Sequence, residues 1–259
     1  MIIARSKKDL DHEISSRKEN GDRIGFVPTM GALHEGHLSL INIAREHSDF
    51  VVASIFVNPA QFAPHEDFDS YPRNEDQDAA NFKKAGVDLV YIPSTEDIYP
   101  NNDRTQWVKT EEAAKGLETD FRPHFFDGVV NVVHRLFKQV TPDVAIFGEK
   151  DYQQLQVIRE SVDTVGIPVE IIGGPIIRDK HGLALSSRNA YLSDSELDTA
   201  RMLNKTLKEV AHNKDFEAAK DILITIGFDK VDYIEERWGR ILGAAWIDKT
   251  RLIDNVPVK

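Results

Sequence analysis

Apolar runs alternate with amphipathic segments through the first two thirds of the chain. The clearest run, residues 50–57, is continuous rather than alternating and stops at Asn58-Pro59. A continuous run of this kind is typical of a strand covered on both faces, as in a parallel sheet. Similar runs predict further strands at residues 23–27, 88–92, 142–147 and 169–172. Between them, helical periodicity predicts helices at residues 36–47, 75–85, 129–140 and 151–165.

This alternation predicts an α/β fold, a Rossmann-like open parallel sheet with helices on both faces. After about residue 177 the pattern changes to charged amphipathic helices and short strands, at residues 193–213, 217–226, 231–235, 241–247 and 251–253. We therefore expect two domains, a Rossmann-like domain over residues 1–176 and a small α+β domain over residues 177–259. The charged first 20 residues carry no predicted element and lack the apolar stretch of a secretory signal.

Composition narrows the class of protein. No apolar run reaches the roughly 18 residues that cross a bilayer, and the chain has no cysteine, which excludes a thiolate nucleophile and cysteine-ligated zinc. The net charge of -11 argues against a nucleic-acid surface, although a few local cations and a helix N-terminus suffice for ATP. We expect a cytoplasmic enzyme with no membrane or nucleic-acid partner.

The first candidate site is PTMGALHEGH, residues 28–37, directly after the first predicted strand. Ligands of open α/β sheets collect beyond the carboxyl ends of the strands. There, Gly36 and exposed N–H groups at a helix start favour a phosphate, and His34 and His37 can donate hydrogen bonds to its oxygens. Two alternatives remain: His34 caps the turn while His37 is a partly buried helix residue, or the pair binds zinc, for which no third ligand stands out.

Two further segments carry candidate chemistry. FGEKDYQQ, residues 147–154, runs from a strand end into a helix and suits ribose and phosphate contacts; the alternative is a solvated helix start capped by Asp151. The loop RDKHGLALSSRN, residues 178–189, offers two hydroxyls and a guanidinium that can close over a triphosphate. Its alternative is an ordinary interdomain loop with a serine cap.

These motifs together resemble a known family. The HxGH and SSR motifs resemble the two signatures of the nucleotidyltransferase superfamily that includes class I aminoacyl-tRNA synthetases. With SIFVNPAQF, YPRN, FGEKDYQQLQVIR, LALSSRNAYLS and TRLIDN in order, the chain more specifically resembles the pantothenate synthetase (pantoate–beta-alanine ligase) family. The resemblance implies ATP-dependent condensation of pantoate with beta-alanine to give pantothenate, AMP and pyrophosphate through pantoyl adenylate. It also implies Mg²⁺ and a homodimer.

Carried over residue by residue, the resemblance assigns catalysis to His37, His34, Lys150 and Arg188, with His37 as proton donor. The implied ATP-binding residues are Met30, Gly31, Ala32, Leu33, His34, Glu35, Gly36, His37, Gly148, Glu149, Lys150, Asp151, Ile177, Leu185, Ser186, Ser187 and Arg188. The implied pantoate and metal contacts are Gln61, Gln154 and Asn58 for pantoate and Asp78 for Mg²⁺. Residues 1–176 would then bind nucleotide and pantoate, and residues 177–259 would form a lid.

The chemistry agrees with this assignment, because a carboxylate joined to AMP gains a good leaving group and needs positioning and oxyanion stabilisation, not a covalent nucleophile. The sequence departs from the family pattern in two places. The usual Arg-Pro-Gly-His-Phe-x-Gly-Val is RPHFFDGV at residues 122–129, so Phe125 replaces the histidine, His124 is its neighbour, and Asn131 replaces a threonine. The segment at residues 236–242 is shorter than in the family.

Three other functions compete with a ligase. An adenylyltransferase would move AMP onto a phosphate, but Gln61 and Gln154 are neutral amides and weak partners for a phosphorylated acceptor. An aminoacyl-tRNA synthetase is disfavoured by a short, acidic chain without an RNA-binding module. A family member that binds ATP without turnover is suggested by the altered residues 122–131.

Overall fold

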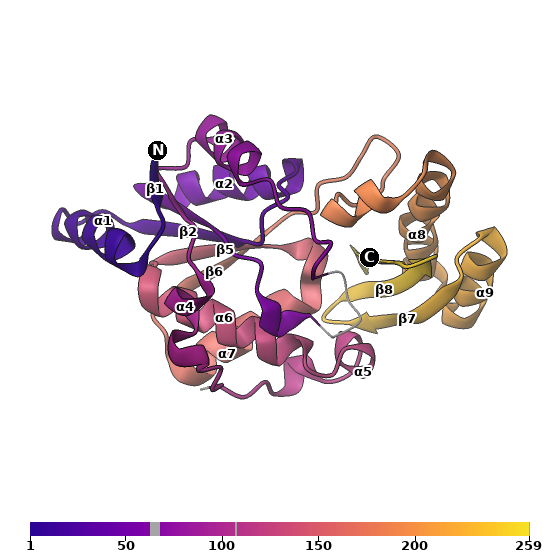
Figure 1. The fold of residues 1–259 in the computed structure, drawn as a ribbon. Helices are drawn as coiled ribbons and strands as arrows, with labels where there is room; N and C mark the ends of the chain where they lie inside the picture. The colour runs from indigo at the N-terminus through magenta and orange to yellow at the C-terminus, as the bar shows by residue number, and fades with distance from the viewer. Residues whose placement is uncertain (63–67, 107, 259) are drawn as a thin grey trace. The chain divides into compact units, whose positions relative to one another are not determined.

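Six strands pair in parallel in the order β1-β4-β3-β2-β5-β6 in the computed structural model (Figure 1). They are β1 Ile2–Ala4, β2 Ile24–Thr29, β3 Phe50–Ile55, β4 Leu89–Tyr91, β5 Val144–Gly148 and β6 Glu170–Gly174. The structure describes residues 1–62, 68–106 and 108–258. From β2 the chain proceeds to β3 on one side, whereas β5 pairs with the other side of β2. The strand order therefore reverses between β2 and β5, where open α/β sheets bind ligands.

Helices cover both faces of this sheet (Figure 1). They are α1 Lys7–Glu19, α2 Glu35–His47, α3 Glu75–Ala85, α4 Thr95–Ile98, α5 Glu118–Phe121, α6 Phe125–Val140 and α7 Tyr152–Val165, with short 3₁₀ helices η1 Pro59–Gln61, η2 Pro100–Asn102, η3 Glu112–Ala114 and η4 Glu149–Asp151. Leu40 of α2 and Phe82 of α3 share a buried cluster with Val51 and Ile146 of the sheet. The helices α6 and α7 lie on the opposite face, and α1 packs against α6. This unit comprises Met1–Glu149 and Gln153–Gly174.

The predicted α/β fold is confirmed, although several elements differ in detail. β1 and α1 were not predicted, because β1 has three residues and α1 buries only Leu10 and Ile14. The helix expected from residue 129 begins at Phe125, so the altered segment includes its first turn. The strand expected to reach residue 57 ends at Ile55, and the chain enters η1 soon after.

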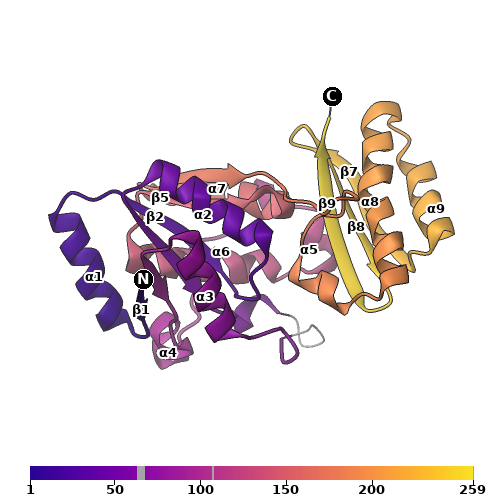
Figure 2. The ribbon, with the colours of Figure 1, turned by 90° about the horizontal axis from the view of Figure 1, so that it is seen from above.

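The second unit comprises Lys150–Tyr152 and Pro175–Lys259 and has its own apolar core. Its antiparallel sheet has the order β7-β8-β9, with β7 Lys230–Arg237, β8 Arg240–Ile247 and β9 Thr250–Pro257; the helices are α8 Asp194–Asn213, α9 Phe216–Ile226 and the 3₁₀ helix η5 Ser187–Tyr191. The helices α8 and α9 lie on one face of the sheet (Figure 2). Trp238 and Gly239 form the turn between β7 and β8 with φ of 51° and 69°, as a two-residue hairpin of type I′ requires.

The expected small α+β region is confirmed, although β9 is longer than the three residues predicted because Asp254 and Asn255 interrupt its apolar pattern. Among the helices that the structure describes, none combines the length and apolarity needed to cross a membrane.

Candidate functional site

The loop after β2 turns sharply at Gly31 and Ala32, whose φ angles are 83° and 52°. Thr29, the last residue of β2, fixes the start of the turn: its hydroxyl donates to the Ser54 carbonyl at 2.7 Å and accepts from the Gly31 N–H at 3.1 Å. The chain then enters α2 at Glu35, which is exposed. The motif thus lies at the end of β2 where the strand order reverses.

Asp78, a residue of α3, anchors the same loop by hydrogen bonds. This residue is only 3% exposed; its Oδ2 accepts the Ala32 N–H at 2.8 Å and its Oδ1 accepts the Leu33 N–H at 2.9 Å. A Cβ on Gly31 would lie 2.9 Å from Asp78 Oδ2, so only glycine fits against this carboxylate. The N–H groups of Gly31, Ala32 and Leu33 therefore have partners inside the protein. These three N–H groups are already used, and the groups expected to favour a phosphate are those at the start of α2.

The two histidines form the start of α2. The His34 Nδ1 accepts the Gly36 N–H at 3.1 Å, and the His34 N–H donates to the His37 Nδ1 at 3.3 Å. The rings face each other with centroids 4.1 Å apart, and both side chains are partly exposed. The interpretation of His34 as a cap and His37 as a partly buried helix residue is therefore confirmed.

This capping arrangement determines where each neutral imidazole carries its proton. A ring nitrogen that accepts a hydrogen bond has no hydrogen of its own, so the proton of each neutral ring lies on the other nitrogen, Nε2. His34 and His37 both accept through Nδ1. Both neutral rings are therefore Nε2–H donors, which is the form that binds anionic oxygen.

Among the described residues, neither Mg²⁺ nor zinc, the alternative considered for the histidine pair, has a set of three protein ligands. Within the described ranges, no group of three or more His, Asp or Glu residues is placed to hold a metal ion, and the sequence has no cysteine. Asp78, the expected Mg²⁺ contact, is buried and uses both carboxylate oxygens on backbone N–H groups. The residues therefore do not fit an ion held by Asp78, and the zinc alternative has no third ligand among them.

Asn58 fixes the orientation of the Gln61 side chain. Asn58, only 1% exposed, accepts on Oδ1 from the Ala60 N–H at 3.1 Å and the Tyr99 hydroxyl at 2.8 Å. Its Nδ2 donates to Gln61 Oε1 at 3.2 Å and to the Gly128 carbonyl at 3.1 Å. Burial raises the pKa of the Tyr99 hydroxyl to about 12, so it stays a donor. With Gln61 Oε1 turned to Asn58, its Nε2 lies 2.9 Å from the sulfur of Met30.

The altered segment before α6 packs beside Gln61. Arg122 lies over the Phe125 ring, 3.7 Å from its centroid, and donates to the Gln61 carbonyl at 3.3 Å. Asn131 is buried; it donates to the Arg104 carbonyl at 2.9 Å and accepts from Arg135. His124 is exposed and makes no side-chain cap bond. The two changed positions therefore differ: Phe125 packs on Arg122, which contacts Gln61, whereas Asn131 bonds the backbone at Arg104.

The end of β5 carries the second candidate segment. A Cβ on Gly148 would meet no atom within 4 Å, so the backbone there borders open space. Glu149, Lys150 and Asp151 form η4, and Lys150 Nζ lies 3.8 Å from Asp151 Oδ2. Gln154 is partly exposed, whereas its neighbour Gln153 is buried and bonds the 113–118 loop. Gly148, Glu149 and Gln154 belong to the first unit, and Lys150 and Asp151 to the second.

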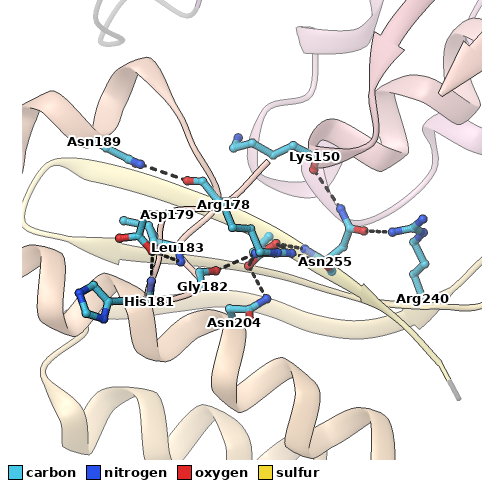
Figure 3. A network of polar contacts seen from close by, with 12 residues as sticks. Lys150, Arg178, Asp179, His181, Gly182, Leu183, Asn189, Asn204, Arg240 and Asn255 are labelled. Atoms are coloured by element: carbon cyan, nitrogen blue, oxygen red, sulfur yellow. Dashed lines mark hydrogen bonds and ion pairs between the residues drawn. The ribbon is translucent and has the colours of Figure 1, made fainter. Parts of the chain in front are cut away.

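The third candidate segment is a folded loop of the second unit (Figure 3). The Leu185 N–H donates to the Ile177 carbonyl at 2.9 Å, and Arg178 and Ala184 form a β-bridge beside them. Ser186 caps η5 by accepting the Arg188 N–H at 3.3 Å, so the serine cap named in the alternative interpretation is present. Ser187 and Arg188 are partly exposed in the first turn of η5.

A buried polar pair at the end of β9 was not among the predicted site residues. Asp254 accepts from both terminal nitrogens of Arg178, at 2.7 and 2.8 Å, and from Asn204 at 3.0 Å. Asn255 donates to the Lys150 carbonyl at 3.0 Å. Two adjacent polar residues in an otherwise apolar strand could have indicated a buried polar site. Their partners lie up to 105 positions away in the sequence, so the sequence does not show which groups they bond.

Comparison with known proteins finds a family that matches nearly the whole chain. The family model described as pantoate-beta-alanine ligase matches residues 2–257. The pantothenate synthetase of Mesorhizobium japonicum is 49% identical over 276 residues, covering 99% of this chain and 97% of the relative, and that of Hyphomonas neptunium is 46% identical over 282 residues, covering 99% and 96%.

Two solved structures share the fold over the whole chain. The pantothenate synthetase of Thermus thermophilus has a TM-score of 0.89 at 39% identity and covers 100% of this chain and 99% of its own. The pantoate-beta-alanine ligase of Francisella tularensis, solved with beta-gamma ATP and beta-alanine, has a TM-score of 0.91 at 38% identity, with 99% and 97% covered.

Proposed function

Because this chain belongs to the pantoate–beta-alanine ligase family, we propose that it condenses pantoate with beta-alanine in two steps with the use of ATP. First, a carboxylate oxygen of pantoate attacks the α-phosphorus of ATP, the bond to the bridging oxygen breaks, and pyrophosphate leaves. Then the amine of beta-alanine attacks the carbonyl carbon of pantoyl adenylate and loses a proton as AMP leaves. The family match over residues 2–257 carries this proposal.

The paired imidazoles supply the chemistry of the first step. Negative charge grows on the phosphate oxygens as pyrophosphate departs, and donors already aimed at that charge lower the barrier. The start of α2 holds the Nδ1 atoms of His34 and His37 and so fixes the orientation of both rings as Nε2–H donors. His37 is the proposed proton donor, and Met30 to Gly36 are the proposed neighbours of the nucleotide.

Each unit carries its own set of proposed ATP contacts. In the first unit, the open backbone at Gly148 and the adjacent Glu149 suit the ribose. In the second unit, Lys150 and Arg188 supply cations for phosphate oxygens. The other proposed contacts in the second unit are Asp151, Ile177, Leu185, Ser186 and Ser187. Residues 1–176 are the proposed nucleotide and pantoate domain, and residues 177–259 the proposed lid.

Pantoate is assigned to the two glutamines of the first unit. Pantoate carries hydroxyl groups beside its carboxylate, which neutral amides can bind with both donors and acceptors. Gln61 has its side-chain oxygen turned toward Asn58, so Asn58 supports this pocket by orienting Gln61. Gln154 is partly exposed on the first turn of α7, where it can reach a ligand. The packing of Phe125 on Arg122 lies beside this pocket.

Mg²⁺ is proposed only as a partner of ATP, whose triphosphate charge it neutralises when bound. Asp78 does not hold it in this proposal, since both of its oxygens accept backbone N–H groups. A homodimer and a cytoplasmic location are proposed from the family resemblance alone. Light scattering on purified protein measures the first; a mass of about one 29.3 kDa chain would contradict it.

Release of AMP and pyrophosphate tests the function directly. ATP, Mg²⁺ and pantoate are supplied with and without beta-alanine. AMP release that requires both organic substrates is the expected result. AMP that stays attached to the product would indicate an adenylyltransferase instead, and ATP binding by folded protein without AMP release would indicate a binding protein without turnover.

A further inference from the structure

Two adjacent polar side chains of β9 point to opposite faces of the small sheet. Successive side chains of a strand alternate in direction. Asp254 shares the face of Leu252 and Val256, which pack in the core beneath α8, and it accepts from Asn204 of α8. Asn255 therefore lies on the other face, where its partner is the segment Lys150–Tyr152.

The backbone of Asn255 is tied down through Asp254 and Arg178. Arg178 pairs with both oxygens of Asp254. It also donates to the carbonyl of Asn255, and both residues are labelled in Figure 3; the distance is 3.1 Å. The Asn255 N–H donates to Asp254 Oδ1 at 2.7 Å. Asn255 is only 2% exposed. Its backbone N–H and carbonyl are both hydrogen-bonded, so the strand position from which its side chain extends is fixed.

The direction of the Asn255 amide follows from its neighbours. Arg240 Nη1 lies 2.8 Å from Oδ1; a guanidinium is only a donor, so it must meet the oxygen of the amide. The Nδ2 group then faces the Lys150 carbonyl at 3.0 Å, which is only an acceptor. The reverse orientation of the amide would place two donors together and two acceptors together. Arg240 also lies over Tyr152, 4.3 Å from the ring centroid, which supports the same segment.

From these contacts we propose that Asn255 is a positioning residue for Lys150; this rests on the proposed phosphate contact of Lys150. The hydrogen bond fixes the peptide that follows the Lys150 Cα, and so the direction in which the side chain leaves the backbone. In Figure 3 the ammonium end of Lys150 points away from Asn255, while the carbonyl faces it. A flexible four-carbon stem enlarges any rotation at its base. Losing the bond displaces the ammonium from the departing pyrophosphate.

The test exchanges Asn255 for a near-isosteric residue that cannot donate. Asn255→Asp keeps an acceptor for Arg240 but meets the Lys150 carbonyl with an oxygen. The rate of pantoate-dependent exchange of pyrophosphate into ATP, which reports adenylation, is expected to fall by about 10²-fold, since a misplacement of about 1 Å has this effect. The apparent KM for pantoate is expected to stay unchanged. Asp232→Asn is the matched control, because Asp232 is a buried partner of Arg251 and Trp246 in the same sheet.

A double-variant cycle separates positioning from stability. In a Lys150→Ala background, Asn255→Asp is expected to change the exchange rate by less than about twofold, because its effect passes through a side chain already removed. An equal loss in both backgrounds, or no loss in either, would overturn the inference and leave the proposed function intact. A Lys150→Ala enzyme with normal exchange would remove the phosphate role of Lys150 and the inference together. If Asn255→Asp unfolds at a lower urea concentration than Asp232→Asn, Asn255→Ser replaces it, since serine is too short for the same bond and adds no charge.

Discussion

Replacing Asp78 by asparagine separates its two candidate roles, anchor of the β2–α2 loop and ligand of Mg²⁺. The carboxylate accepts the N–H groups of Ala32 and Leu33 at 2.8 and 2.9 Å. An asparagine can accept only one of them, and its NH₂ group then faces the other N–H. A hydrogen bond to a charged acceptor contributes about 1.5–3 kcal/mol, and a buried donor left without a partner costs about 1–3 kcal/mol. We expect Asp78→Asn to lower the free energy of unfolding by about 2–4 kcal/mol.

The catalytic consequence comes from the same loop, which leads directly into His34. A shift of about 1 Å in the imidazoles should lower the rate of pyrophosphate exchange by about 10²-fold. The Mg²⁺ concentration that gives half the maximal rate should match the wild-type value, because the carboxylate holds backbone N–H groups and not the ion.

The assay combines urea denaturation with pyrophosphate exchange over a titration of Mg²⁺. Asp76→Asn is the matched control, since Asp76 also lies in the first turn of α3 but is exposed. It removes the same charge from the same helix start without touching the loop. An Asp78→Asn enzyme that is as stable as the control and regains full rate at high Mg²⁺ would refute the anchoring role in favour of metal binding.

Three further predictions concern other side chains. His37→Ala should lower the adenylation rate by about 10²–10³-fold, the usual effect of removing one transition-state donor; near-normal turnover of folded enzyme would exclude the proposed role. Gln61→Ala should raise the apparent KM for pantoate far more than that for ATP, and equal shifts would contradict the pantoate assignment. Burial, aided by the charge of Lys138, lowers the pKa of His134 from 6.5 to about 4. Between these values the unfolded chain takes up a proton that the folded protein does not, so stability falls as pH falls. In urea titrations from pH 7 to 4.5, His134→Gln should show a smaller fall, and an equal fall in both proteins would count against His134 as its source.

The sequence predicted the fold class because strands such as Phe50–Ile55 and Val144–Gly148 are covered on both faces and so are almost wholly apolar. It could not predict β1, whose three residues gain their partner only from β4, or the order of the strands. That order places the ends of β2 and β5 at the point of reversal. It depends on pairings between distant segments, which leave no local pattern.

The candidate site also has a part that the sequence predicted and a part that it could not predict. Positions such as His34 and Gln61 follow from motifs, and their roles in binding stay predictions. The residues that hold these side chains in place could not be predicted from the sequence. Asp78 lies 45 or 46 residues from the loop it anchors, and Tyr99 lies 41 residues from Asn58. Buried polar side chains of this kind hydrogen-bond to groups that are distant in the sequence and come close only in the folded protein.

The caps at the start of α2 also bear on how this enzyme could be stabilised. Residues kept for chemistry usually cost a protein stability, so replacing them tends to strengthen the fold. His34 is different, because the imidazole proposed to bind phosphate also caps the helix. Serine or aspartate is a better helix cap than histidine and would be the natural choice at this position in a thermostabilised variant. Either one would remove an Nε2–H donor, so a search guided by stability alone would select against the activity at this position.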